Sequence, residues 1–531
     1  MMQSDFDVII VGSGPSGVSA AFPLVRSGLK VLMVDGGQKP NALAPDDDYL
    51  SARMHGSAQA EWMLGKNFHA LHPQAFRIPK LRVPTHEYVF KDFLRANRIQ
   101  SENFTAVGSL ATGGLSNAWG CGVARLSPQE CRQFPFPYDE IQSSYEHIAK
   151  RIGVSGAIAD DLSAYFGLDQ WAQPPIMMDR LHTHLNQRYL QKKKQLAHQP
   201  FLLGRTRMAV LSESLEGREA CQQLANCFWG CRNKSLYNAS DELTALNRYP
   251  NLTHLQGFIV EQIAARQSLW VIEGTVQSTQ EKSRISARKI ILALGTLAST
   301  SLVVRALKLT TSLSLYSNPN AVFLLWLPRL LNNTYQPSLS GAQLSFTLKL
   351  NEALTALGST FPANTIPSSE FLSHLPLRRS IGIDLLKTLV NAFLIGNVML
   401  PSSLSKTTLS LKANGTVLIQ GAYHPETDEY MWILQKQLRR IFLTMGAIML
   451  PRSFKIGAIG SDLHYVGTLP MRKMPDRGET GPYGEVHGLE GVYVVDGACL
   501  PIVTEKFHTL TMMANADRIA RHLVESGIGT N

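Results

Sequence analysis

The sequence predicts an α/β protein of the Rossmann type with a second domain, and three observations support this class. The chain has 531 residues, more than one hydrophobic core normally holds, so two domains are expected. Apolar residues make up 44% of the chain and charged residues 17%, which are proportions of a globular protein. The N-terminus reads as a strand, a glycine-rich turn, a helix and a second strand, which is how a parallel sheet begins.

The stretch FDVIIVGSGPSGVSAAFPLVRSGLKVLMVDGG contains this pattern. Phe6–Val11 is an apolar, β-branched run that suits a buried parallel strand. Gly12, Gly14 and Gly17 then form G-x-G-x-x-G, a helix pattern follows, and residues 30–34 read as the second strand. We find no second copy of the triplet, so a separate NAD(P) domain is not expected.

Each part of the pattern suits a dinucleotide. Gly12 allows a tight turn, Gly14 lets the backbone approach a pyrophosphate, and Gly17 lets the helix pack closely on the strand. The helix N-terminus offers free N–H groups and the positive end of its dipole to the phosphates. Asp35 ends the second strand 18 residues after Gly17, where it can accept hydrogen bonds from an adenosine ribose. The binding residues predicted here are Gly12, Gly14, Pro15, Ser16, Gly17, Asp35 and Gly36.

Charge and hydropathy limit the classes of binding partner and the cellular location that we expect. The formal net charge is +10, but the basic residues are scattered except for QKKKQ at 191–195, so we expect no nucleic-acid partner. The opening residues show no basic-then-apolar leader and no twin arginine, so we expect a cytoplasmic protein with reduced cysteines. The apolar segments 321–331 and 385–400 are shorter than a membrane span. We interpret them as core helices or strands; a surface touching lipid or an apolar substrate is the alternative, and peripheral membrane contact is not expected.

Several blocks further along the chain resemble one family. HYVGTLPM at 464–471, VYVVDGA at 492–498 and HTLTMMANADRIARHL at 508–523 resemble the C-terminal signature of the glucose-methanol-choline (GMC) oxidoreductases, which bind FAD. TGGLSNAWGCG at 112–122 resembles the flavin-contacting segment of the sugar-oxidising branch related to pyranose oxidase, and CFWGCRNKSLYNASDEL at 227–243 resembles a loop of bacterial members. Residues 311–455 match only loosely, as the substrate domain of the family usually does.

The resemblance implies a GMC or p-hydroxybenzoate-hydroxylase-like architecture. Segments 1–45, 96–150, 215–310 and 460–531 are expected to form a discontinuous FAD-binding domain. Segments 46–95, 151–214 and 311–459 are expected to form the substrate domain and its lid, built on an antiparallel sheet with helices. The further cofactor-binding residues that it implies are Gly114, Ser116, Asn117, Trp119, Gly120, Val260, Asp496, Gly497 and Thr509.

Two features of these cofactor residues qualify the resemblance. Asn117 and Trp119 either border the flavin or simply pack the turn. Some members of the branch tether FAD through a histidine at the position of Ala118, and alanine cannot form that bond. The cofactor is therefore expected to be non-covalent FAD.

The catalytic residues are expected near the C-terminus. In the family, the histidine of H-x-x-G-T and a histidine or asparagine before the last helix face the flavin, hold the substrate hydroxyl and accept its proton while hydride passes to flavin N5. His464 occupies the first position, and an imidazole is a suitable general base. An ungapped alignment places Phe507 at the second position, with His508 next to it and Thr509 as a possible helix cap. We expect His508 to replace Phe507 beside the flavin; the alternative is a site that works with His464 alone.

The resemblance thus predicts an FAD-dependent alcohol oxidase or dehydrogenase that acts on CH–OH donors such as a sugar, a glycoconjugate or another alcohol, with an unidentified electron acceptor. Two alternatives stay open: an altered or non-redox, lyase-like enzyme on the same fold, and a catalytically degenerate flavin-binding partner protein. Cys221, Cys227 and Cys231 have spacings that match no zinc or iron–sulfur motif. We interpret them as reduced structural thiols, and no metal site is predicted.

Overall fold

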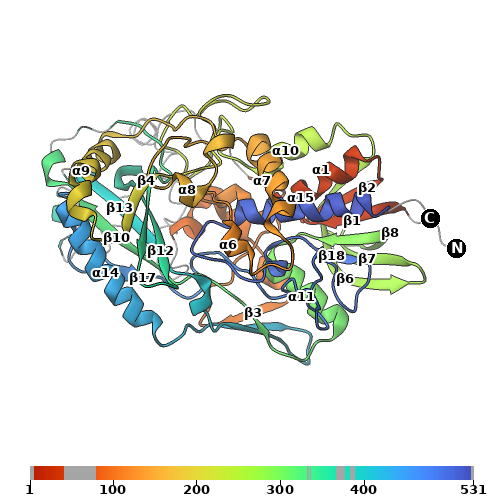
Figure 1. Cartoon of the computed structure of the whole chain (residues 1–531). Helices are drawn as coiled ribbons and strands as arrows, with labels where there is room; N and C mark the ends of the chain where they lie inside the picture. Colours follow the sequence, from red (N-terminus) through yellow and green to blue (C-terminus); the bar gives the residue numbers. More distant parts are fainter. Residues whose placement is uncertain are drawn as a thin grey trace.

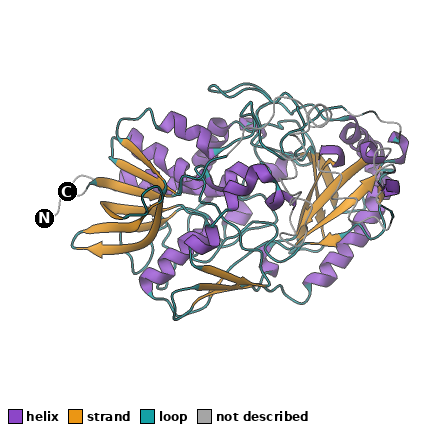
Figure 2. Ribbon diagram, turned by 180° about the vertical axis from the view of Figure 1, so that it is seen from behind, coloured by secondary structure: helices purple, strands orange, loops and turns teal. Residues whose placement is uncertain are grey.

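A computed structural model of the chain describes residues 5–40, 79–331, 334, 336–365, 377–378, 380–382, 385 and 389–527. Within these residues the strands form two seven-stranded sheets and one four-stranded sheet. Figure 2 shows the two larger sheets at opposite ends of the molecule, with helices packed between and around them. The predicted α/β class, with a Rossmann-like part and an antiparallel part, is confirmed.

The first large sheet has the order β5-β2-β1-β8-β7-β6, with β18 also paired to β8. Strand β1 lies between β2 and β8 and is parallel to both. Its residues Val8 to Val11 are at most 1% exposed, because a central parallel strand is covered on both faces. The strands are β1 (Phe6–Val11), β2 (Val31–Asp35), β5 (Leu252–Gln256), β6 (Phe258–Arg266), β7 (Leu269–Val276), β8 (Lys282–Leu292) and β18 (Val492–Val494).

Helices from both ends of the chain cover this sheet. Helix α15 (Thr509–Glu525) packs along α1 (Pro15–Arg26) and α7 (Tyr138–Ile152), as Figure 1 shows. Helix α10 (Ala239–Leu246) also contacts α1, and α11 (Thr296–Leu307) follows β8 directly. The last helix of the described chain is therefore part of the core that the first helix begins.

The second large sheet is antiparallel throughout and lies at the other end of the molecule (Figure 1). Helices α9 (Arg180–Leu196) and α14 (Thr427–Thr444) contribute to the apolar core on one of its faces. Its strands are β4 (Phe201–Arg205), β10 (Asn320–Trp326), β11 (Leu344–Lys349), β12 (Thr355–Pro362), β13 (Phe393–Met399), β16 (Ile448–Met449) and β17 (Lys455–Ile456).

A small third sheet links segments that the sequence divides between the two domains. Strand β3 (Ile99–Glu102) pairs with β15 (Val417–Gln420), which continues through β14 (Thr408–Leu411) to β9 (Leu313–Ser314). Residues 46–78 of the predicted lid lie outside the described residues. The short helices are α4 (Glu87–Phe90), α5 (Phe93–Ala96), α6 (Pro128–Cys131) and α8 (Ser163–Phe166), and two 3-10 turns, η4 (Gly114–Ala118) and η10 (Gly497–Cys499), lie close to the site.

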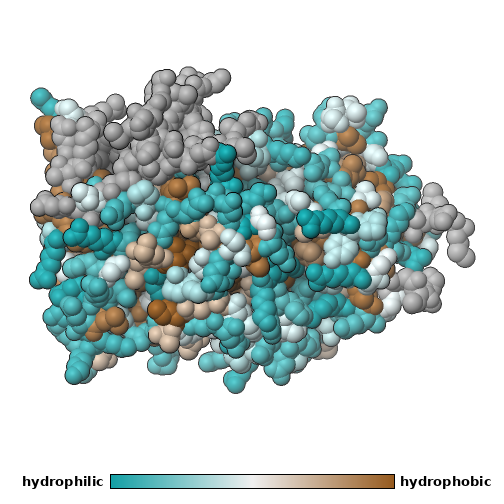
Figure 3. Space-filling view, turned by 90° about the horizontal axis from the view of Figure 1, so that it is seen from above, coloured by the Kyte–Doolittle hydropathy of each residue, from teal (hydrophilic) through white to brown (hydrophobic). Residues whose placement is uncertain are grey.

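The two apolar segments are strands over most of their described length. Strand β10 begins one residue before segment 321–331 and covers its first six residues. Strand β13 lies in segment 385–400, and the two strands pair with each other; part of 383–388 lies outside the described residues. Over the part of the chain that the structure describes, no helix is both long and apolar enough to cross a membrane. The face in Figure 3 is mostly hydrophilic, with hydrophobic residues in small scattered groups.

Candidate functional site

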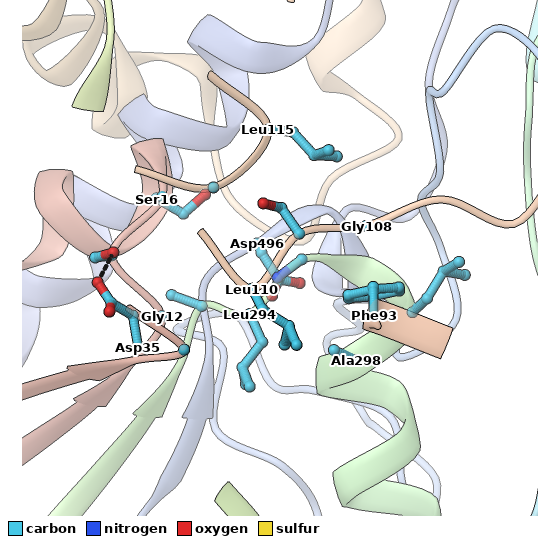
Figure 4. A pocket seen from close by; sticks show the side chains of 18 of the residues that line it. Gly12, Ser16, Asp35, Phe93, Gly108, Leu110, Leu115, Leu294, Ala298 and Asp496 are labelled. Atoms are coloured by element: carbon cyan, nitrogen blue, oxygen red, sulfur yellow. Dashed lines mark hydrogen bonds between the residues drawn. The ribbon is translucent and has the colours of Figure 1, made fainter. Parts of the chain in front are cut away.

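One large cavity lies where the glycine-rich loop, the end of β8 and the start of α15 meet. The space between the protein atoms there is about 1070 Å³, part of which is open to solvent. Figure 4 shows side chains from these distant segments converging on it. The predicted residues that line it are Gly12, Gly14, Pro15, Ser16, Asp35, Gly36, Gly114, Val260, Asp496 and His508.

The glycine-rich loop requires glycine at two of its three glycine positions. Gly12 has φ +109°, and a Cβ there would lie 2.6 Å from the carbonyl carbon of Ala293, so both backbone and space require glycine. A Cβ on Gly17 would overlap the carbonyl oxygen of Gly12, which explains its role in packing although it does not line the cavity. Gly14 differs, because a Cβ placed there would meet no atom closer than the Cα of Gly114, at 3.9 Å. Its missing side chain leaves open space in the cavity.

The start of α1 presents unsatisfied polar groups to that space. Gly14 is the N-cap residue and supplies no side-chain cap, so the first N–H groups of the helix are left for a ligand. The hydroxyl of Ser16 lines the cavity, is buried, and has no hydrogen-bond partner within the described chain. A buried orphan hydroxyl beside free N–H groups fits a phosphate.

Asp35 lines the cavity but is already well supplied with donors. The Ser13 hydroxyl donates to its Oδ2 (the dashed line in Figure 4), and the Gly37 N–H and the Thr112 hydroxyl donate to its Oδ1 at 2.8 and 3.2 Å. The Nε2 of His254, a residue of β5, lies 2.9 Å from Oδ2. The sequence identified Asp35 but missed its partners, since three of the four come from outside its own turn.

The predicted residues of segment 112–122 mainly stabilise the local turn, and most of them do not line the cavity. Gly114 faces the cavity, but Ser116, Asn117, Trp119 and Gly120 do not line it. Ser116 accepts the N–H of Ala239 at 3.0 Å, at the start of α10. The amide of Asn117 donates to the carbonyls of Thr112 and Gly114 at 2.9 and 2.7 Å, and the indole of Trp119 donates to that of Tyr237 at 2.9 Å. For Asn117 and Trp119 the structure therefore favours the turn-packing alternative.

Asp496 closes the cavity from the end of β18. Its carboxylate accepts the N–H groups of Gly295 and Ala498, both at 2.9 Å, and the hydroxyl of Ser299. Burial raises its pKa to about 6 despite these donors. The adjacent Gly497 does not line the cavity; a Cβ there would lie 2.6 Å from the carbonyl oxygen of Tyr465.

The two candidate catalytic histidines lie together. The ring centroids of His464 and His508 are 4.7 Å apart, with the rings edge to face. His508 lines the cavity. His464 does not line it, but its ring packs against that of His508, and its neighbours Leu463 and Tyr465 are part of the lining. Burial lowers the pKa of His464 to about 4. Burial and the neighbouring His464 ring hold the pKa of His508 well below its usual value, so both rings are neutral at pH 7.

The loop before His464 is held in an unusual backbone conformation. Leu463 has φ +61°, a left-handed conformation that costs a non-glycine residue free energy. Asp462 secures this turn by accepting the N–H of His464 at 3.2 Å and that of Asn318 at 2.7 Å. The side chain of Asn318 then contacts the His464 ring, with 3.2 Å between Oδ1 and Nδ1. No motif or spacing in the sequence points to Asn318, which is 146 residues from His464.

The phenyl ring of Phe507 points away from the large cavity. It lines a second, smaller hollow and packs against an apolar cluster that includes Phe166 and Leu357. Thr509 is not the helix cap that the sequence suggested: His508 takes the N-cap position and accepts the N–H of Met512 at 2.9 Å, and Thr509 is the first helical residue, off the cavity wall. The same loop turns His508, not Phe507, towards the large cavity.

The cysteines show no sign of a metal centre. Cys221, Cys227 and Cys231 are free thiols, and burial raises the pKa of Cys221 to about 12. No group of three or more histidine, cysteine, aspartate or glutamate side chains in the described chain could hold a metal ion.

Comparison with known proteins gives a consistent result. Residues 453–516 match the GMC oxidoreductase family. The chain is 24% identical over 550 residues to 6'''-hydroxyparomomycin C oxidase of Streptomyces lividus, across 97% of this chain and 91% of the relative. Its fold is similar to that of pyridoxine 4-oxidase from Mesorbium loti, with a TM-score of 0.60 at 14% identity, over 98% of this chain and 99% of that one. The match over residues 453–516 and the similarity to the full-length relative agree with the resemblance to the GMC oxidoreductases, and the solved structure shares the fold.

Proposed function

We propose that this protein is an FAD-dependent oxidoreductase that oxidises a hydroxyl group of a small molecule, with His464 as the base and His508 as its partner. One observation carries the proposal: the cavity that begins at the glycine-rich loop reaches His508, whose ring centroid lies 4.7 Å from that of His464. A nucleotide site with a proton acceptor beside it is what alcohol oxidation by a flavin requires.

The residues present fit non-covalent FAD. Gly14 leaves room beside the free N–H groups of α1, and the orphan hydroxyl of Ser16 points at the same space. The position equivalent to the tethering histidine of some relatives is Ala118, which cannot form a covalent bond. FAD, when bound, supplies the two-electron acceptor for the hydride of the carbinol carbon.

The protein side chains supply the proton chemistry. An alcohol gives up hydride readily only as its hydroxyl proton leaves, so a neutral base must contact the oxygen. His464 is neutral across the physiological range because its pKa is lowered to about 4. His508 adds a second polar ring that orients the oxygen, while the apolar environment of Phe507 keeps that residue out of the reaction.

The relatives suggest where to look for the substrate. One is named as an oxidase of 6'''-hydroxyparomomycin C and the other as a pyridoxine 4-oxidase. We propose a primary or secondary hydroxyl of a sugar, a glycoconjugate or another alcohol as the donor group. Since both relatives are named oxidases, oxygen is the first electron acceptor to test.

The test has two parts. Acid precipitation of the purified protein should release FAD into the supernatant, and flavin that stays in the pellet would contradict non-covalent binding. An anaerobic panel of sugars and alcohols should then bleach the flavin. A protein that binds FAD but is reduced by none of them would instead support a lyase-like or degenerate protein.

A pair of variants tests the roles of the two rings. His464→Ala should keep FAD bound and slow reduction by about 10²-fold or more, the usual scale for loss of a general base. Phe507→Leu is the matched control, since Phe507 lies next to His508 but outside the large cavity; it should reduce within a few-fold of the parent. Equal rates for His464→Ala and the parent would show that His464 is structural.

A further inference from the structure

The hydrogen bonds of Asn318 determine the orientation of its side-chain amide. Asn318 precedes β10 in the substrate part of the chain and is fully buried. Its Nδ2 lies 2.7 Å from the carbonyl oxygen of Leu400 and 2.9 Å from that of Thr504. A carbonyl can only accept a hydrogen bond, so the NH₂ end of the amide must face these two oxygens.

The orientation of the amide fixes the proton on His464. With NH₂ assigned to the two carbonyls, the atom 3.2 Å from His464 Nδ1 is the amide oxygen. An amide oxygen accepts but does not donate, so Nδ1 must carry the proton of the neutral ring. The other nitrogen, Nε2, then has a free lone pair, and no group in the described chain donates to it.

We propose that Asn318 is a positioning residue that holds His464 in the Nδ1–H tautomer, so that Nε2 is the proton acceptor and the N–H of His508 is the hydrogen-bond donor to the substrate oxygen. The division of roles follows from counting protons. The substrate hydroxyl donates its one proton to Nε2 of His464, and its oxygen lone pairs then require a donor. His508 is neutral, carries one N–H, and is the ring in contact with His464.

Asn318 also hydrogen-bonds to the loops that carry the two histidines and so helps to set the distance between their rings. Thr504 lies four residues before His508, on the loop that leads into α15, and Leu400 follows β13. The backbone N–H of Asn318 donates in turn to Asp462, which holds the His464 loop. One side chain thus joins both histidine loops to the antiparallel sheet.

The placement of the proton can be measured without catalysis. The protein would be labelled with ¹⁵N-histidine, and the His464 signals assigned by their loss in His464→Gln. Long-range ¹H–¹⁵N spectra of the FAD-bound and FAD-free parent should show a neutral His464 ring with its proton on Nδ1. A proton on Nε2 in the parent overturns the proposal, and this measurement needs no Asn318 variant to fold.

Variants then test the role of the amide, which rests on the proposed function. In Asn318→Ala the Nε2–H form should grow at the expense of the Nδ1–H form, and anaerobic flavin reduction should slow about 10-fold, the scale of one hydrogen bond. The matched control is Asn320→Ala, which removes a hydrogen bond of 2.9 Å to Ser461 in the same loop but touches neither histidine. It should leave both the tautomer and the rate unchanged.

The outcomes separate the two proposals. An unchanged tautomer in a folded Asn318→Ala overturns the role of Asn318, and equal slowing in Asn320→Ala would assign the effect to the loop as a whole. A parent that no alcohol reduces overturns the proposed function, and with it the catalytic role of the tautomer, while the spectra still report where the proton lies.

Discussion

Replacing Gly14 by alanine should weaken FAD binding while leaving the apoprotein intact. Gly14 has φ −71°, which any residue can adopt, and a Cβ there would meet only the Cα of Gly114, at an ordinary contact distance of 3.9 Å. The change costs about 0.5–1 kcal/mol because alanine is a poorer N-cap than glycine. The same change stabilises the folded protein by about 0.4–1 kcal/mol, because alanine leaves the unfolded chain less conformational entropy than glycine does. The two roughly cancel, so the Tm of the apoprotein should move by less than about 2 °C.

The effect on the cofactor should be much larger. The methyl group would occupy the space in which the phosphates approach the N–H groups of α1. Losing two hydrogen bonds to a charged group costs about 3–5 kcal/mol, which corresponds to roughly 10²–10⁴-fold in affinity. Titration of the apoprotein with FAD, followed by flavin fluorescence, measures this directly. Binding within about threefold of the parent would refute the placement of the phosphates at Gly14.

Gly12→Ala is the informative comparison, because the same substitution two residues earlier should fail for a different reason. Here φ is +109°, and the new Cβ would lie 2.6 and 2.9 Å from backbone atoms of Ala293 and Leu294. Strain of this kind typically costs about 1–3 kcal/mol for the backbone conformation alone, and the clash adds to it. The Tm of apo Gly12→Ala should fall clearly below that of apo Gly14→Ala; equal values would contradict the geometry.

Four further predictions concern the pH response and the supporting residues. The rate of flavin reduction should be constant from about pH 5 upward and fall with a midpoint near the His464 pKa of about 4; a midpoint at or above the ordinary histidine value of about 6.5 would contradict it. Burial raises the pKa of Asp462 to about 7, so the folded protein binds a proton that the unfolded chain releases, and stability is lost as pH rises from about 4 to 7. Asp462→Asn cannot titrate, so the Tm of the variant minus that of the parent should increase as the pH is raised from about 4 to 7. A Tm difference that stays constant over this pH range would be evidence against the buried proton. Phe507→Ala should lower the unfolding free energy by about 1–4 kcal/mol in denaturant titrations without changing FAD affinity, since the ring packs outside the large cavity; weaker FAD binding would argue otherwise. His254→Ala should weaken FAD binding about 10-fold by freeing Asp35 to move, with Asp35 still present to accept the ribose; an unchanged Kd would show that His254 only packs the sheet.

The N-terminal half of the site could be predicted because its signals are local. Strand β1 has the bounds that its apolar run predicts, and β2 begins one residue later than expected, at Val31. Gly12 and Gly17 are required by contacts within this unit or with the adjoining end of β8. The geometry of the strand, turn and helix can therefore be predicted from the local sequence.

The histidine site could be predicted only in part. The motif located His464, and chemical reasoning favoured His508 over Phe507; the structure places His508 on the cavity because the apolar cluster takes up the phenyl ring. Asn318 could not be predicted, because an asparagine far away in sequence has no periodic or spacing signal. The same holds for His254 beside Asp35, whose contact depends on the pairing of β5 with β2.

The packing of α15 along α1 has a consequence for how the protein is made. Ribosomes synthesise chains at about 5–20 residues per second, so the glycine-rich loop emerges roughly 25–100 s before His508 does. Through that interval, β8 lacks its partner β18 and α1 lacks the helix that packs along it. The cavity wall is complete only when both ends of the chain have met. The complete site for the proposed flavin therefore forms only after synthesis of the C-terminal helix, and the nascent chain carries an uncovered apolar face of α1 until that helix arrives.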